Sequence, residues 1–290
     1  MEPVFVELNN KYLKVTLCSL GASIYRIRFH DEDMLLTPKS KKDFEKDNAY
    51  YGKTIGRVCG RMLAKPFGEY KPEDNEKGVS LHGGFNGLST KVFNVNSGVN
   101  FVEFHYLSKD GEAGYPGNLI LRVRYELNDN QLLVSYYAVT DKPTLLAITN
   151  HSYFCLGEKS LDGLSLKMVA DKYITTDNRL VIQDLEDIPE KWDFKQGRKL
   201  SPIGDIDNFF LLNKKTIELY SKNYQLKIDS NFNGVQLFTD HWLDNIPMLS
   251  TDEKIHRGIA IEPQDNQLER KELLPKQSYE RYIKYTFIKL

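Results

Sequence analysis

The sequence has only three cysteines in 290 residues, and they are far apart, at Cys18, Cys59 and Cys155. They form neither a CxxC pair nor a Cys/His cluster with the spacing of a metal site. A small, odd and scattered set is typical of reduced thiols inside the cell. We therefore expect a cytoplasmic protein without a disulfide framework.

Long hydrophobic runs are also missing. The N-terminus, Met1 to Glu7, has neither the basic start nor the apolar core of a secretion signal. No segment approaches the roughly 20 apolar residues that a membrane-spanning helix needs. We expect no membrane among the partners of this chain.

Charge of one sign is not in excess, because 39 Lys and Arg stand against 40 Asp and Glu. The densest basic cluster, Lys39 to Lys46, is interrupted by Asp43 and Glu45 and indicates a solvated loop. Nucleic-acid binding normally shows a basic stripe, so we expect no nucleic-acid partner. With 41% hydrophobic residues the chain can form a large core, and we expect residues 1–290 to form one domain.

Helical periodicity is scarce, whereas strict alternation of apolar and polar residues is common. It predicts strands over 101–107, 121–127 and 283–287, each with one buried and one solvated face. The run 132–139 is apolar at nearly every position and predicts a central strand buried on both faces.

Two short helices are expected, at 40–51 and 184–191. So many strands with so little helix predict an all-β fold, a large antiparallel β-sandwich.

The chain has six histidines, and any one of them is more often structural or exposed than functional. Two have informative neighbours. His82 precedes Gly83 and Gly84, which allow a tight turn or a close backbone approach to a ligand. His151 lies in a polar cluster directly after the apolar segment 145–148, where polar side chains often form a site.

Glu262 ends an apolar strand, and Pro263 is expected to terminate that strand or to place it at an edge. A partly desolvated carboxylate there would have a raised pKa, as a general base needs. A glutamate that simply faces water is an equally good interpretation. Arg61 could bind sugar hydroxyls or equally anchor a loop through an ion pair. Asp207 lies between apolar residues in an otherwise polar loop, where a capping or turn aspartate is the more common outcome.

Seven segments, taken together and in this order, resemble the aldose 1-epimerase (galactose mutarotase) family. They are Gly56–Arg61, Leu81–Gly84, Gly114–Gly117, Thr149–Phe154, Ile206–Asp207, Gly234–Gln236 and Ile261–Gln264. The resemblance implies a large galactose mutarotase-like β-sandwich. It further implies that Glu262 is the general base and His151 the general acid, and that Arg61, His82, Asp207 and Gln236 hold the sugar.

The implied reaction is the interconversion of the α and β anomers of an aldohexose such as galactose or glucose. The ring opens when a base takes the proton of the C1 hydroxyl and an acid protonates the ring oxygen. Each positioned proton transfer typically contributes about 10²–10⁴-fold. The reaction needs no metal, nucleotide or other cofactor. The expected partner is a small aldose, bound by a monomer or a homodimer.

The chain departs from the family pattern at Gly60, where the family usually has Asn before the sugar-binding Arg, so one polar sugar contact is missing or replaced. A hexose-6-phosphate 1-epimerase is one alternative, for which Arg57 is a candidate phosphate contact. A non-catalytic carbohydrate-binding protein on the same fold is another. A metal enzyme that uses His82, His151 and Glu262 would lack the usual ligand spacing.

Overall fold

A computed structural model describes residues 2–241 and 245–290 of the chain. Strands account for 49% of the structure and helices for 8%. The expectation of an all-β protein is therefore confirmed.

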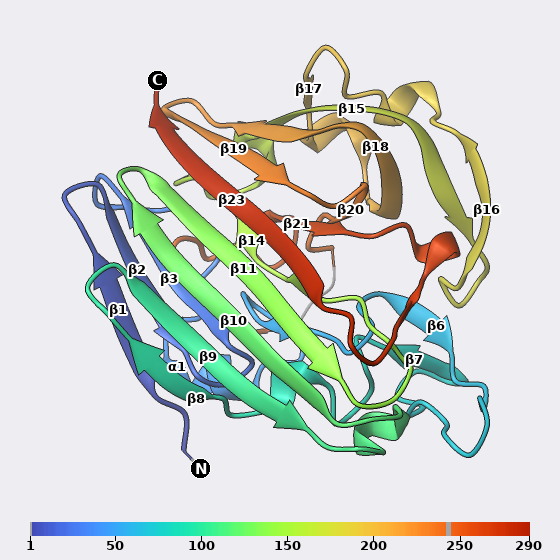
Figure 1. The fold of residues 1–290 in the computed structure, drawn as a ribbon. Helices are drawn as coiled ribbons and strands as arrows, with labels where there is room; N and C mark the ends of the chain where they lie inside the picture. Colours follow the sequence, from blue (N-terminus) through green and yellow to red (C-terminus); the bar gives the residue numbers. More distant parts are fainter. Residues whose placement is uncertain (1, 242–244) are drawn as a thin grey trace.

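A single large antiparallel sheet contains 13 of the strands in the described part of the chain. Its strand order is β14 (Tyr153–Phe154), β21 (Ile259–Gln264), β20 (Gly234–Phe238), β18 (Asp207–Tyr220), β19 (Tyr224–Ser230), β23 (Tyr279–Lys289), β11 (Gln131–Thr140), β10 (Leu119–Asn128), β9 (Phe101–Ser108) and β8 (Asn94–Ser97). The long strand β15 (Ser165–Thr176) continues the sheet from β18 and pairs with β16 (Ile182–Asp187) and β17 (Arg198–Lys199). The C-terminal strand β23 lies between β11 and β19 and joins the two halves of the sheet (Figure 1).

A second sheet comprises β1 (Phe5–Asn9), β2 (Leu13–Cys18), β3 (Ser23–Phe29) and β4 (Glu32–Asp33). Strands β1 to β3 lie behind β9 to β11 in Figure 1. Val15 and Ile27 of this sheet share one buried core with Val123 and Tyr285 of the large sheet. The phenol of Tyr125 crosses the interface and donates a hydrogen bond to the carbonyl of Ala22. Two sheets packed face to face in this way form the expected sandwich.

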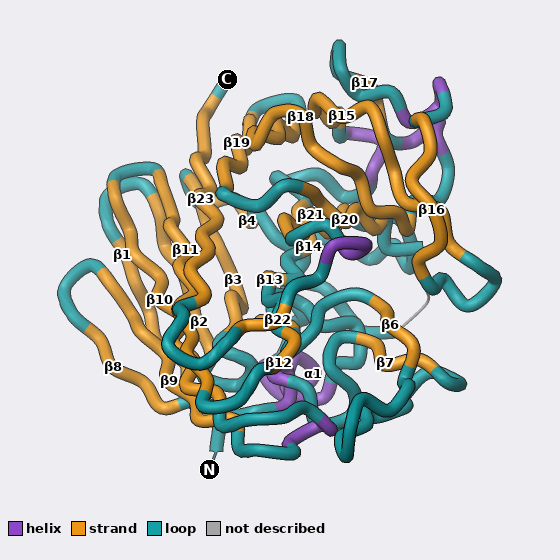
Figure 2. The backbone as a smooth tube through the Cα atoms, turned by 45° about the vertical axis from the view of Figure 1, so that its right-hand side comes forward, coloured by secondary structure: helices purple, strands orange, loops and turns teal. Residues whose placement is uncertain are grey.

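Three further strand pairs lie outside the two sheets. They are β12 (Thr144–Leu145) with β22 (Glu272–Leu273), β5 (Thr54–Ile55) with β13 (Thr149–Asn150), and β6 (Arg61–Leu63) with β7 (Val79–Leu81). In Figure 2 the short strands β13, β14, β20 and β21 lie in the middle of the molecule, with β6 and β7 at its lower right. These short elements surround the site described below.

Helices are few and short. The segment expected to be helical at 40–51 contains α1 (Lys41–Lys46), whose first turn is capped by the Ser40 hydroxyl. The helix expected at 184–191 is wrong, because the first half of that segment belongs to strand β16 and only Glu190–Trp192 forms a 3₁₀ turn. The other 3₁₀ turns are Leu88–Thr90, Glu112–Gly114, Leu161–Gly163, Ser201–Ile203 and Gln267–Glu269.

The strands expected at 101–107, 121–127 and 283–287 are confirmed within β9, β10 and β23, although Glu103, on the face of β9 expected to be solvated, is buried. The expectation for 132–139 is half right: β11 is a central strand, but only alternate residues are fully buried. Its other residues lie on the opposite face of the sheet and are only partly buried.

Pro263 does not end its strand, because β21 continues to Gln264. Strand β14 pairs only with Ile259 and Ala260, so the stretch that contains Pro263 has β20 as its one strand partner in the large sheet. The edge position allows for the missing N–H of proline.

No helix in the described part of the chain is long and apolar enough to cross a membrane.

Candidate active site

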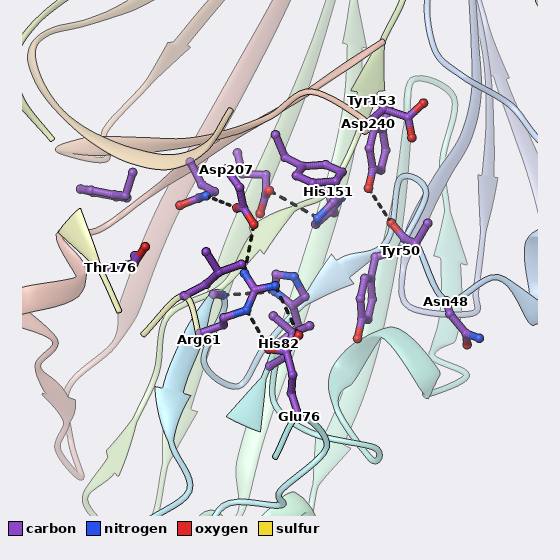
Figure 3. Close-up of a pocket in the computed structure, with 18 of the residues that line it drawn as sticks. Asn48, Tyr50, Arg61, Glu76, His82, His151, Tyr153, Thr176, Asp207 and Asp240 are labelled. Carbon is purple, nitrogen blue, oxygen red and sulfur yellow. Dashed lines mark hydrogen bonds and ion pairs between the residues drawn. The ribbon is translucent and has the colours of Figure 1, made fainter. Parts of the chain in front are cut away.

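A cavity of about 550 Å³ opens beside the ends of β6, β18, β20 and β21. All six residues singled out in the sequence line it, namely Arg61, His82, His151, Asp207, Gln236 and Glu262. Residues from the first quarter of the chain therefore meet residues from the last quarter. Figure 3 shows Arg61, His82, His151 and Asp207 pointing toward one another.

Strand register brings three of these residues together. Gln236 on β20 lies directly opposite Glu262 on β21, and Phe209 on β18 lies opposite Gln236. Asp207 is two residues before Phe209, and alternate residues of a strand point to the same face. Asp207, Gln236 and Glu262 consequently project side by side from three neighbouring strands.

His151 comes from the turn between β13 and β14. Its Nε2 atom lies 3.4 Å from Oε1 of Glu262. Both side chains are buried, with exposed fractions of 6% for His151 and 1% for Glu262. Within the described residues, Nδ1 of His151 and Oε2 of Glu262 have no hydrogen-bond partner. Each group therefore keeps one atom that the protein leaves without a bond.

Arg61 and Asp207 form the centre of a polar network. The Arg61 guanidinium donates from Nε to Glu76, at 2.7 Å, and from Nη1 to Oδ2 of Asp207, at 3.3 Å. The other carboxylate oxygen of Asp207 accepts a 2.8 Å hydrogen bond from the amide of Gln236. These bonds fix the orientation of all four side chains. Arg61 therefore both forms ion pairs and lines the cavity.

His82 is held by its backbone and by its ring nitrogen. Its φ is +51°, and Gly83 and Gly84 follow with φ of +91° and +89°, so the chain turns sharply here. The Gly60 N–H donates to Nδ1 of His82 at 3.2 Å. In the neutral ring, acceptance at Nδ1 places the proton on Nε2, which is then a hydrogen-bond donor. The rings of Tyr50 and His151 lie 4.7 and 5.3 Å from the His82 ring.

Burial dominates the pKa values of the two central groups. It raises the pKa of Glu262 well above 4.5, with a further contribution from Asp207. It lowers the pKa of His151 to about 3. Burial also lowers the pKa of His82 and raises that of Asp207. Because the low-polarity surroundings penalise charge on both members, the Glu262–His151 pair holds one proton over a wide pH range.

Several residues of the cavity carry no local sequence signal. Glu76, Tyr50 and Gln267 reach it only through the folding of the chain. The β15–β16 hairpin adds an apolar wall that includes Ile174 and Ile182.

The cation Arg57, considered as a phosphate contact, is not among the lining residues. Its guanidinium donates hydrogen bonds to Ser108 and to the carbonyls of Lys109, Pro116 and Gly117. It is a buried structural clamp, and a phosphate role for it is wrong. Within the described residues, no group of three or more His, Cys, Asp or Glu side chains is arranged to hold a metal ion.

Residues 5–286 match the family model described as aldose 1-epimerase. The galactose mutarotase of Rattus norvegicus is 28% identical over 288 residues, which cover 89% of this chain and 84% of that protein. The aldose 1-epimerase of Escherichia coli (strain K12) is 29% identical, with 88% and 83% covered. The solved structure of a GalM/aldose epimerase homologue from C. elegans superposes with a TM-score of 0.90 at 29% identity and covers all of both chains. The fold is galactose mutarotase-like, and the chain belongs to the aldose 1-epimerase family of isomerases.

Proposed function

We propose that this protein interconverts the α and β anomers of a free aldohexose, such as galactose or glucose, by acid–base ring opening and closure. The observation that carries the proposal is the buried pair of Glu262 and His151, 3.4 Å apart at the wall of a cavity large enough for a sugar. A carboxyl group and an imidazole are the two groups that this chemistry requires.

In the proposed mechanism, ring opening starts from the form of the pair in which its one proton lies on His151 and Glu262 is ionised, the form that burial disfavours. Glu262 takes the proton of the C1 hydroxyl while His151 gives its proton to the ring oxygen. The C1–O5 bond breaks as the C1=O bond forms, and neither oxygen passes through a free charged state. Rotation about C1–C2 presents the other face of the aldehyde, and the two proton transfers then run in reverse.

The pair needs only one proton for this cycle. Opening the ring moves that proton, in effect, from His151 to Glu262, and closing the ring moves it back. The open-chain sugar therefore faces a neutral carboxyl and a neutral imidazole, the arrangement that burial of both groups favours.

The remaining polar groups would hold the sugar. Arg61 and the Nε2–H of His82 supply donors, and the carboxylate of Asp207 supplies an acceptor. Gln236, which is bonded to Asp207, would complete this side of the cavity.

Charge in the cavity favours a neutral sugar over a phosphorylated one. Among the described residues, the lining has two cationic side chains, Lys46 and Arg61, against four acidic ones outside the Glu262–His151 pair. Arg61 is already shared between Glu76 and Asp207. A phosphate dianion would meet more negative than positive charge, which disfavours a hexose-6-phosphate substrate.

Anomer exchange followed by polarimetry or NMR tests the proposal. Freshly dissolved α-galactose, α-glucose and their 6-phosphates are compared with and without the protein. We expect faster exchange of a free hexose and little or no effect on the phosphates. A buffer rate for every sugar, combined with measurable sugar binding, would instead favour a carbohydrate-binding protein; acceleration of the phosphates alone would favour the hexose-6-phosphate alternative.

A further inference from the structure

Position 60 has no side chain, and a neighbouring residue occupies the space that one would fill. A Cβ atom built on Gly60 would lie 3.0 Å from Nε2 and 3.3 Å from Oε1 of Gln267. Gly60 and Gln267 both line the cavity. The carboxamide of Gln267 therefore stands where a side chain of residue 60 would project.

Gln267 belongs to a well-anchored turn. It begins the 3₁₀ turn Gln267–Glu269 that follows β21, and the side chain of Asn266 accepts a hydrogen bond from Leu268 N–H. The Asn266 N–H donates to Oδ1 of Asn233 at 2.7 Å, which ties the turn to the loop before β20. Gln267 as a whole residue is only 6% exposed. Its carboxamide is consequently held in place before any ligand arrives.

Part of this carboxamide is still available. Its Nε2 donates one hydrogen bond, of 3.2 Å, to Oε1 of Gln264. A primary amide has two N–H donors and an acceptor oxygen. Across residues 2–241 and 245–290, no protein group donates to Oε1 of Gln267. One donor and the acceptor thus remain for a ligand, beside the Gly60 N–H that holds His82.

We propose that Gln267 is a specificity-determining residue that binds one hydroxyl group of the sugar, on the Gly60–His82 side of the cavity. A sugar hydroxyl both donates and accepts, so the free N–H and the free oxygen of one carboxamide match it. A buried amide that loses this partner would be left unsatisfied, which is how a site discriminates against a sugar without that hydroxyl. The inference rests on the proposed function for its choice of ligand.

The test compares the wild type with Gln267→Met, which keeps the length of the side chain and removes its hydrogen bonds. Gln277→Met, at an exposed glutamine outside the cavity lining, is the matched control. Anomer exchange is measured for galactose, glucose and their 2-, 3-, 4- and 6-deoxy analogues, which all keep the hemiacetal. We expect kcat/KM of Gln267→Met to fall about three- to tenfold for the parent sugar, mostly through KM. One analogue should react equally with both proteins, because it already lacks the contacted hydroxyl.

A second variant tests the same contact between Gln267 and the sugar by changing residue 60, which lies beside the Gln267 carboxamide. Gly60 has a φ of +71°, a conformation that asparagine tolerates better than most residues. Gly60→Asn should displace the Gln267 carboxamide, impair recognition of the same hydroxyl, and add little to the effect of Gln267→Met.

An equal loss across all analogues, no loss at all, or full additivity of the two substitutions would overturn the inference. If the wild type catalyses no anomer exchange, the proposed function fails, and the same sugars and variants are then compared by NMR titration of binding. In that case a hydroxyl-specific loss of affinity in Gln267→Met still supports the contact, and its absence refutes it.

Discussion

Glu262 and His151 have different roles in the proposed reaction, as base and as acid. The role of the Glu262 carboxyl group can be tested with a substitution that hardly changes the shape of the side chain. Glu262→Gln keeps the shape of the side chain but removes its ability to take a proton. We expect kcat to fall by about 10²–10⁴-fold, while the affinity for the sugar changes little.

NMR anomer exchange and sugar titration check this expectation together. Glu272→Gln, at an exposed glutamate on β22, is the control. Near wild-type activity of Glu262→Gln would remove Glu262 from the proton transfers, and loss of the folded state would mark it as structural.

The same pair predicts a particular dependence of stability on pH. Below pH 4.5 the unfolded chain protonates both groups, whereas the folded pair keeps one proton until the pKa of His151, about 3. The unfolded state then binds more protons, so acid destabilises the protein. Above 6.5 the unfolded chain binds no proton at these groups and the folded pair still binds one, so stability falls as pH rises. Between 4.5 and 6.5 each state binds one proton and the contribution is flat.

Chemical denaturation across this range tests the pair against Glu262→Gln/His151→Asn, which removes both titrations. The free energy of unfolding of the wild type should decline relative to the variant on both sides of the plateau, by up to about 1.4 kcal/mol per pH unit. A difference between the two proteins that stays constant with pH would show that the pair is not buried as described.

Among the elements, the turn that presents His82 is the most sensitive to a small change. A Cβ on Gly83 would lie 2.0 Å from the carbonyl oxygen of Gly56, at a φ of +91°. Gly111 has a φ of +81° and nothing within 4 Å of its Cβ position. Alanine at position 111 would meet only the unfavourable backbone conformation, whereas alanine at position 83 would also meet a steric overlap. A comparison of the two substitutions therefore separates the two costs.

We expect Gly111→Ala to cost about 1–2 kcal/mol of stability from the left-handed backbone alone. Gly83→Ala should cost clearly more, because backbone atoms must move, and it should also impair the site by displacing His82. Denaturant unfolding and sugar affinity measure the two effects. Equal costs at both positions would mean that the Gly56–Gly83 contact has no consequence.

Secondary structure was predictable where packing and sequence pattern agree. The alternation in β9, β10 and β23 marks the buried face correctly, because each strand has one face on the core. Strand β16 is almost wholly exposed and acidic, and its pairing with β15 makes it a strand despite weak local preference.

Cavity residues were predictable to the extent that short motifs carry them. His82 and Glu262 lie in recognisable segments, and register then explains why Asp207 and Gln236 join them. Glu76 and Gln267 could not be found in this way, because their positions depend on how β7 and the turn after β21 fold against the 59–61 backbone.

At the scale of the whole molecule, one hydrophobic core extends from Leu8 on β1 to Phe287 on β23. Both sheets contribute to it, so neither can lose its packing alone. We propose that residues 1–290 form a single domain and unfold in one cooperative step. Far-UV circular dichroism and tryptophan fluorescence should give coincident transitions in denaturant. Two separated transitions would refute a single unit.

Strand β23 has a consequence for how the protein is made. A ribosome synthesises this strand after every other strand of the large sheet, yet it lies between β11 and β19 and holds the two halves of that sheet together. A premature stop at Tyr279 would remove all 11 residues of the strand and leave two long strand edges open on the nascent product. We therefore expect a nonsense mutation just before β23 to be as harmful as one much earlier in the chain, and to give an aggregated product rather than a slightly shortened enzyme.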